Sequence, residues 1–389
     1  MVFSNIEFKN FSQKKNTSKI KKIFNELICD YYDGHNQILV SLSKKYKYKS
    51  ILKKLKKYKH SKEFRLFGIG GSILGAEAVY SFLKKKIKKK FTFINDLNIN
   101  RNQKFKNKPI NIIISKSGNT LETLSNFNSE KIKKNCLFIT ENKDSYIRSL
   151  ALKLKSEIID HNNFIGGRYS VLSETGMIPA FFMGLNPDKF KSLDNLISSR
   201  KFINYLTSNV SSILAFHQNQ KNNSIILNYD KSSANLFYWY QQLVAESLGK
   251  SSKGILPIVS SIPKDNHSLM QLYLDGFKKN FFTFFYVKDN FSKNIDNKNL
   301  LNTHDYLKNK KITDILYAQF RATQQVFSQK KIPFRSFVIK KRDEKTLGEI
   351  FAFFILETIL LGKALRIDPY SQPAVELIKK NTIKILKKY

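Results

Sequence analysis

The sequence predicts an α/β protein built from parallel sheets in two domains, and three observations support this fold class. Short β-branched runs alternate with helical patterns between residues 64 and 160, and again after residue 224. Such alternation is typical of parallel sheets covered by helices. Two of the runs end in small-residue turns, Gly68 to Ser72 and Ser115 to Thr120. The chain has 389 residues, enough for two domains of ordinary size.

The apolar pattern places each element and divides the chain. We expect a helical segment at residues 1–60, a first sheet domain at 61–200 and a second at 201–389, with the boundary in the range 185–220. Strands are expected at 64–69, 91–95, 110–115, 136–140, 157–160, 225–229, 281–287 and 334–340. Helices are expected at 72–87, 119–133, 145–155, 173–182, 190–215, 232–248, 268–277, 312–329 and 346–365, with a last helix from about Pro373.

The composition is that of a globular chain, with 42% apolar and 13% aromatic residues. Cys29 and Cys136 lie far apart without a CxxC spacing, which argues against disulfides and structural zinc and fits a reducing compartment. The first residues turn polar at once, and the longest apolar stretch, residues 350–361, is too short to span a bilayer. We therefore expect a cytoplasmic protein without a membrane partner.

The formal net charge of +38 raises the question of a polyanion partner. The basic residues are mostly lysines spread along the whole chain, together with abundant Asn, Ile, Phe and Tyr. All of these residues have AT-rich codons, so a genome of low GC content explains the charge without such a partner. We expect no nucleic-acid partner, and binding to DNA at physiological salt would distinguish the alternative.

The two small-residue turns together predict a phosphate site. A strand that ends in such a turn before a helix aims several free backbone N–H groups at one point. Neighbouring strand ends of a parallel sheet would bring both turns to one crevice. Candidate side-chain donors there are Ser72, Ser115, Lys116, Ser117 and Thr120. By itself, the first turn could equally be a tight turn of any α/β protein.

Common nucleotide motifs do not explain these turns. Ile73 stands where a dinucleotide fingerprint needs its third glycine. Val244 stands where a Walker loop ending at Gly249-Lys250-Ser251 would need glycine. The sequence therefore favours a phosphorylated small molecule over a nucleotide or a polymer.

Four further residues are candidates for chemistry, each with a plainer alternative. Arg168 follows two glycines and is able to stabilise an oxyanion, or is a surface arginine. Glu246 is a candidate general base, or pairs with Lys250 four residues later on a helix. His267 has a side chain suited to proton transfer near neutral pH, or joins a helix cap with Asp265 or Asn266. Lys379 extends into solvent, or is a buried ammonium that contacts a sugar hydroxyl.

The sequences of six segments, and their order along the chain, strengthen these assignments. GIGGS, SKSGNTLET, GGRYS, AESLGK, DNHSLMQL and QPAVELIKK occur in the order seen in phosphoglucose isomerases, which the chain resembles over residues 64 to 380. The resemblance implies two sugar-isomerase (SIS) domains and the reversible conversion of glucose 6-phosphate to fructose 6-phosphate. It implies a sugar phosphate as partner, no cofactor and no metal. It also implies a homodimer with shared active sites.

Residue roles follow from the same resemblance. It implies that Glu246 is the base that moves a proton between C2 and C1, and that Arg168 stabilises the cis-enediolate. His267 matches the ring-opening histidine and Lys379 the C-terminal lysine. The substrate-binding residues implied are Gly71, Ser72, Ser115, Lys116, Ser117, Thr120 and Gln372.

The chain also departs from the family pattern. The family usually has VELGK near its end, whereas this chain has Ile378 in place of the glycine, which adds bulk beside Lys379. The alternatives are a related isomerase that also accepts mannose 6-phosphate and a non-catalytic sugar-phosphate sensor. A sensor would need the phosphate loop but not Glu246, Arg168 and His267 together.

Overall fold

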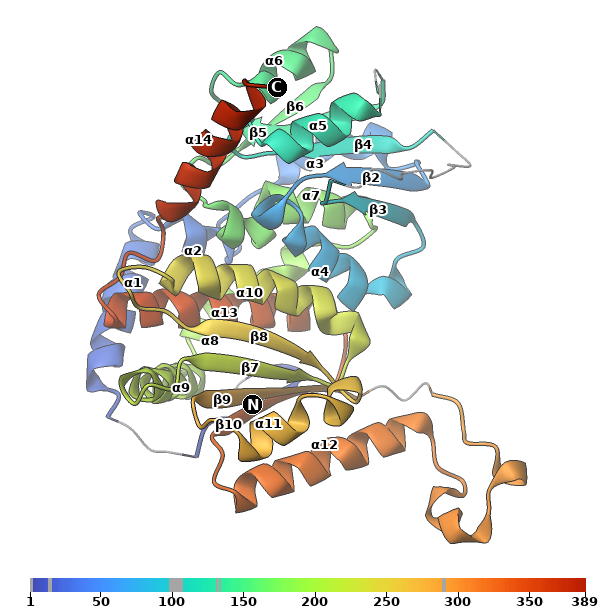
Figure 1. The fold of residues 1–389 in the computed structure, drawn as a ribbon. Helices are drawn as coiled ribbons and strands as arrows, with labels where there is room; N and C mark the ends of the chain where they lie inside the picture. The colour runs from blue at the N-terminus through green and yellow to red at the C-terminus, as the bar shows by residue number, and fades with distance from the viewer. Residues whose placement is uncertain (1–2, 13–15, 98–107, 131, 133, 289–291) are drawn as a thin grey trace.

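Two five-stranded sheets form the framework of the molecule in the computed structural model (Figure 1). The structure describes residues 3–12, 16–97, 108–130, 132, 134–288 and 292–389. The strands of the first sheet lie in the order β3, β2, β4, β5 and β6, and every neighbouring pair is parallel. Their bounds are β2 Glu63–Phe67, β3 Lys90–Ile94, β4 Ile110–Ile114, β5 Cys136–Glu141 and β6 Glu157–His161. The five strands predicted in this half are therefore confirmed within two residues.

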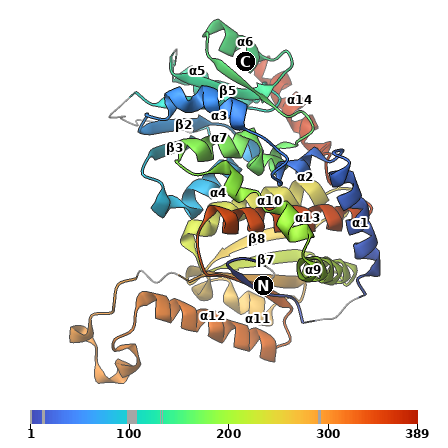
Figure 2. The same ribbon diagram turned by 180° about the vertical axis from the view of Figure 1, so that it is seen from behind.

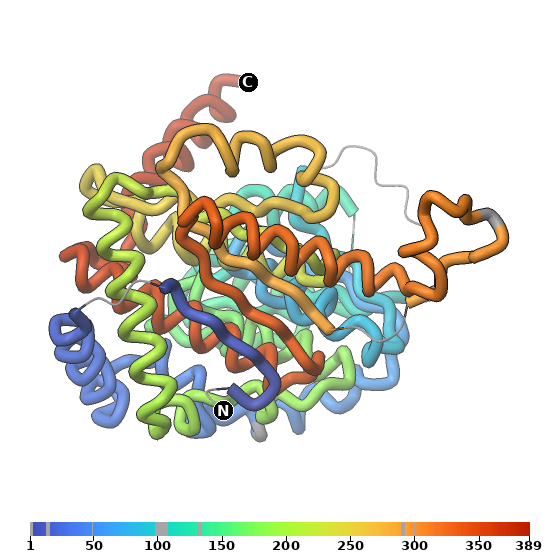
Figure 3. The backbone as a smooth tube through the Cα atoms, turned by 90° about the horizontal axis from the view of Figure 1, so that it is seen from below, coloured from blue at the N-terminus to red at the C-terminus, as the bar shows by residue number. Residues whose placement is uncertain are grey.

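The second sheet has the order β1, β10, β9, β7 and β8. Its bounds are β1 Ile6–Lys9, β7 Asn223–Asn228, β8 Leu256–Ser261, β9 Asn280–Val287 and β10 Phe334–Ile339. Four strands are parallel, and β1 joins the edge antiparallel to β10 (Figure 3). The sequence did not predict β1 and β8, which are short strands at the two edges. Residues 1–60 are thus not wholly helical, since their first strand belongs to the second sheet.

The helices follow the predicted ranges closely. Their bounds are α1 Ser18–Tyr32, α2 Gln37–Ser41, α3 Lys49–Leu55, α4 Leu74–Phe82, α5 Leu121–Ser129, α6 Tyr146–Lys153, α7 Glu174–Phe182, α8 Leu193–Ile197, α9 Arg200–Gln218, α10 Ala234–Leu248, α11 Met270–Asp275, α12 Ile312–Gln329, α13 Glu344–Ala364 and α14 Ala374–Leu386. The range 190–215 is two helices, because the Ser199 side chain caps a new helix at Phe202 N. Residues 131 and 133 of the range predicted for α5 lie outside the described residues.

A shared layer of helices joins the two sheets. Helix α10 packs against α4 from the first half and against α13, and α4 also contacts α7 (Figures 1 and 2). Helix α13 is apolar on all sides and almost entirely buried, as expected for a helix enclosed by others. Helices α5 and α6 cover the outer face of the first sheet, and α11 and α12 that of the second. The two halves therefore share one core.

Helix α14 differs from all of these helices because none of its residues is buried. It leaves the body after the loop at residues 368–372 and carries the C-terminus away from the core (Figure 3). Within the described residues, no helix is long and apolar enough to cross a membrane.

Candidate active site

The candidate site lies where the carboxyl ends of β2 and β4 face the helix α10 of the second half. The loop after β2 forms a short 3₁₀ turn at Gly70–Ser72. A Cβ on Gly71 would lie 2.2 Å from the carbonyl carbon of Gly167, so only glycine lets these two loops touch. Gly70 has a φ of +55°, and a Cβ there would lie 2.8 Å from Gln242 Nε2. The two glycines thus bring the first loop against both the Arg168 turn and α10.

The loop after β4 is held in place by hydrogen bonds of its own hydroxyl groups. Ser115 Oγ lies 2.8 Å from Thr120 Oγ1 and accepts a hydrogen bond of 3.1 Å from Gly118 N. Gly118 has a φ of +69°, which favours glycine. Ser117 and Asn119 are exposed at the rim. Backbone N–H and hydroxyl groups before α5 thus surround a position that is able to hold an anion.

Lys116 is directed toward a neighbouring turn. Its Nζ donates to Asn163 O at 3.0 Å and lies 3.3 Å from Glu141 Oε1. Ser72 is half-buried at the end of its 3₁₀ turn. The Lys116 ammonium therefore also links the loop at residues 115–120 to the segment that follows β6.

Arg168 is the most constrained polar side chain of the site, with 2% of its surface exposed. Its Nε donates to Ser247 Oγ at 2.8 Å, and its Nη2 donates to Pro369 O at 2.7 Å and to Ser371 O at 3.1 Å. Its Nη1 donates to Gln372 Oε1 and lies 3.4 Å from Glu246 Oε2. The arginine thus joins its own turn, α10 and the loop before α14.

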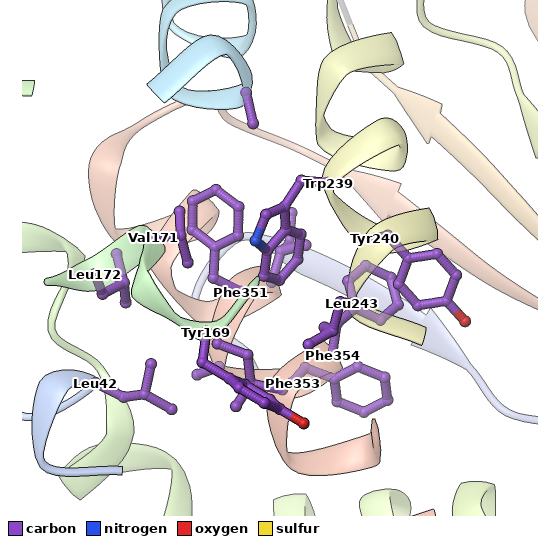
Figure 4. Close-up of a cluster of buried hydrophobic side chains, with 14 of the residues drawn as sticks. Leu42, Tyr169, Val171, Leu172, Trp239, Tyr240, Leu243, Phe351, Phe353 and Phe354 are labelled. Carbon is purple, nitrogen blue, oxygen red and sulfur yellow. The ribbon is translucent and has the colours of Figure 1, made fainter. Parts of the chain in front are cut away.

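Apolar packing holds the turn that carries Arg168. This 3₁₀ turn spans Gly167–Leu172. Tyr169, Val171 and Leu172 lie in one buried cluster with Trp239 of α10 and with α13 (Figure 4). The backbone of the arginine is therefore set by a core that belongs to both halves of the chain.

Glu246 lies near the end of α10 and is half-buried. Its Oε1 accepts a hydrogen bond of 2.9 Å from Gln242 Nε2. Its other oxygen faces Arg168. Gln242 was missed in the sequence, although its position four residues before Glu246 on a helix was a usable signal. The site thus presents a carboxylate oriented by an amide and a guanidinium.

The predicted alternative for Glu246, an ion pair with the Lys250 side chain, is wrong. Lys250 Nζ donates instead to the backbone oxygen of Glu246 at 3.0 Å and to Ser371 O. Burial, followed by the nearby charge of Arg168, lowers the pKa of Lys250. The Asp368 carboxylate accepts from the backbone N–H groups of Tyr370 and Ser371 at 2.9 and 3.2 Å. The contacts of Lys250 and of Asp368 both fix the loop at residues 368–372, which presents Gln372.

The structure does not bring His267 to this site. His267 is exposed in a 3₁₀ turn, Lys264–His267, and Asp265 accepts from Ser260 and Ser261 at the end of β8. Gln241 of α10 donates to Pro257 at the start of β8, and α10 then continues to Glu246. The two residues thus lie at opposite ends of a six-residue strand, about 20 Å long.

Lys379 also lies apart from the residues above. It stands on α14, pairs with Glu376 at 2.6 Å, and has 57% of its side chain exposed. The prediction of a helix that begins at residue 268, directly after His267, is also corrected, since α11 begins only at Met270. Among the described residues, no three or more His, Cys, Asp or Glu side chains are grouped to hold a metal ion.

These features define a class of protein, an α/β isomerase of phosphorylated sugars. A carboxylate lies 3.4 Å from an arginine, and the Gly71 loop contacts the turn of that arginine, an arrangement that suits proton transfer next to a carbonyl. A family model described as phosphoglucose isomerase matches residues 53–256, about half of the chain. The chain belongs to the phosphoglucose isomerase family, as its motifs predicted.

Relatives and solved structures agree with this family. A glucose-6-phosphate isomerase of Methanocaldococcus jannaschii is 30% identical, covering 83% of this chain and 84% of that protein. One from Mycoplasmopsis pulmonis is 31% identical, covering 83% and 82%. A hypothetical protein of Thermus thermophilus has a TM-score of 0.83 at 20% identity, with 94% of each chain covered. A glucose-6-phosphate isomerase of Chlamydia trachomatis has a TM-score of 0.67 at 18% identity, covering 87% and 73%. The structural matches confirm the predicted fold class of two SIS domains.

Proposed function

We propose that this chain interconverts glucose 6-phosphate and fructose 6-phosphate through a cis-enediolate. The observation that carries the proposal is the Glu246 carboxylate 3.4 Å from the guanidinium of Arg168, whose turn is contacted by the loop at Gly71. Membership of the phosphoglucose isomerase family and relatives named glucose-6-phosphate isomerase support this substrate pair.

The roles of the residues follow from the chemistry of the reaction. Glu246 removes the proton from C2 of the open-chain aldose and returns it to C1 of the enediolate. Arg168 faces the oxygens that become negative during the transfer. The loop residues Ser115, Ser117 and Thr120 hold the phosphate, with Gly71, Ser72 and Lys116 beside it. One proton moves from C2 to C1 and another from O2 to O1, and no electrons leave the substrate, so the reaction needs no redox cofactor.

A coupled assay of the purified protein tests this proposal. Glucose 6-phosphate should be turned over, with mannose 6-phosphate as the comparison that tests the broader alternative. Glu246→Gln should lower kcat by at least about 10²-fold, the usual contribution of a general base, without changing the melting temperature. Binding of sugar phosphate without turnover would favour the sensor instead.

We further propose a homodimer in which His267 serves the site of the second copy. The basis is the separation of His267 from Glu246 within one chain, by about the length of β8. A twofold dimer would then contain two equivalent shared sites. The role that the resemblance implies for Lys379 stays a prediction.

Two inactive variants test the shared site. Glu246→Gln and His267→Ala are mixed, unfolded and refolded together. A mixed dimer contains one site with both native residues, so it should regain up to about half of the wild-type activity. No recovery in proven mixed dimers would place His267 outside the partner's site.

The cytoplasmic location, based on cysteine usage, is tested by cell fractionation.

A further inference from the structure

His161 is a buried histidine whose two ring nitrogens both face acceptors. It ends β6 and is 2% exposed. Its Nδ1 lies 3.3 Å from Glu174 Oε2, and its Nε2 lies 3.1 Å from Ile165 O. A carboxylate and a backbone carbonyl can only accept hydrogen bonds. The Nε2–H of His161 therefore donates to Ile165 O, and its Nδ1 lies within hydrogen-bond distance of the Glu174 carboxylate.

The groups around Glu174 favour its charged form. Burial would raise the pKa of Glu174, but the hydrogen bonds from His161 and Tyr46 outweigh burial and the pKa lies below its ordinary value. Tyr46 OH donates to Glu174 Oε1 at 2.5 Å. Burial lowers the pKa of the neighbouring Lys191 well below its ordinary value, so Lys191 is not counted as a cation beside Glu174. A buried carboxylate of this kind is stable only with partners, which His161 and Tyr46 supply.

The other contact of His161 leads directly to the candidate site. Ile165 precedes Gly166 and Gly167, and Arg168 follows. The far end of this turn is already fixed, because Tyr48 and Lys191 both donate to Leu172 O. The near end is fixed by His161 at Ile165 O.

We propose that His161 is a positioning residue, whose Nε2–H fixes the carbonyl of Ile165 and so sets where Arg168 meets Glu246. The inference rests on the role proposed above for Arg168. A misplacement of about 1 Å in a reacting group can cost up to about 10²-fold in rate. The phosphate loop is held by its own hydrogen bonds, so loss of this anchor should lower kcat while KM changes little.

The test removes the anchor without leaving a buried carboxylate unpaired. In Glu174→Gln, the amide oxygen still accepts from Tyr46 and the amide N–H donates to His161 Nδ1. His161 then keeps its Nε2–H on Ile165 O, so kcat should stay within about 3-fold of wild type. Adding His161→Leu removes that donor, together with the Nδ1 acceptor of the new amide, and should lower kcat by about 10-fold further, with KM for fructose 6-phosphate within about 2-fold. His161→Gln in the same background restores a donor and should recover part of the loss.

The outcomes separate this inference from the proposed function. Equal kcat in Glu174→Gln and in the double variant with His161→Leu would overturn the positioning role, as would a rise in KM equal to the fall in kcat. No recovery with His161→Gln would also overturn it. Arg168→Met is assayed in parallel, because normal turnover in that variant would remove the role of Arg168 itself. Wild-type protein without isomerase activity would refute the proposed function.

Discussion

The two sheets have the same parallel core, but their carboxyl edges are occupied differently. At the first edge, the loop at residues 115–120 contains no carboxylate and surrounds an anion position with N–H and hydroxyl groups. At the second edge, Asp230 follows β7 and accepts two hydrogen bonds from Arg342, at 2.9 and 2.6 Å. Ser233, just before α10, donates its hydroxyl to the same carboxylate. The second edge thus contains its own anion.

This difference indicates how one architecture gives two roles. The N-terminus of a helix beside a strand end attracts an anion in either half. The second half satisfies that position internally, and its contribution to the site is the far end of α10, with Gln242 and Glu246. The first half leaves the position for a ligand. In the function proposed above, one half therefore binds the phosphate, and the other supplies the base.

The largest expected effect comes from separating the two loops of the first half. Gly71→Ala places a Cβ 2.2 Å from the Gly167 carbonyl carbon, which forces a shift of more than about 1 Å. We expect kcat to fall by at least about 10²-fold and the melting temperature to fall as well. Gly167→Ala is the matched control, because its Cβ would lie an ordinary 3.7 Å from Gly71 Cα. Similar steady-state rates in the two variants would contradict the role of this contact.

A buried carboxylate in each half gives the second comparison. Glu357 pairs with Arg335 in the second half. Glu77 in α4 accepts from Asn95, and within the described residues no ion pair involves it. Burial raises the pKa of Glu77 from 4.5 to about 7. The folded state therefore holds this proton more tightly than the unfolded state, so stability falls as the pH rises from about 4.5 to about 7.

Glu77→Gln removes this pH-dependent cost while keeping an acceptor for Asn95. The pKa difference corresponds to about 3 kcal/mol above pH 7. We expect the variant to gain most of this stability at pH 8 and almost none at pH 4, measured by urea unfolding at both values. An equal change at the two pH values would show that Glu77 does not titrate in this range.

Breaking the internal anion site of the second edge should affect stability alone. Arg342→Met leaves Asp230 without its cation, and both side chains are mostly buried, with 16% and 13% exposed. We expect a loss of about 2 kcal/mol in the free energy of unfolding, with KM unchanged. Asp230→Asn combined with Arg342→Met should recover part of that loss, as a double-mutant cycle would measure. A raised KM would contradict the separation of roles between the two edges.

The sequence predicted the framework and the turns that end β2 and β4, because both depend on local patterns. Buried strands such as β4 are continuous apolar runs, and glycine turns mark where loops touch. The edge strands β1 and β8 were missed because short, half-exposed strands give weak patterns. The Asp230–Arg342 pair and the contact of Lys250 with Ser371 join residues over a hundred positions apart. Such contacts depend on tertiary packing, which one sequence does not reveal.

The smallest expected effect compares two hydroxyls in equivalent places. Thr120 precedes α5 and Ser233 precedes α10, and neither side chain caps its helix. Thr120→Ala removes a donor from the proposed phosphate position, so KM for fructose 6-phosphate should rise by about 10-fold, the effect of one hydrogen bond to a charged group. Ser233→Ala removes a hydrogen bond to Asp230, so stability should fall by about 1 kcal/mol while KM stays constant. Because both variants delete a hydroxyl just before a helix, a change in KM limited to Thr120→Ala would assign the phosphate to the first edge. Equal KM values would remove that assignment.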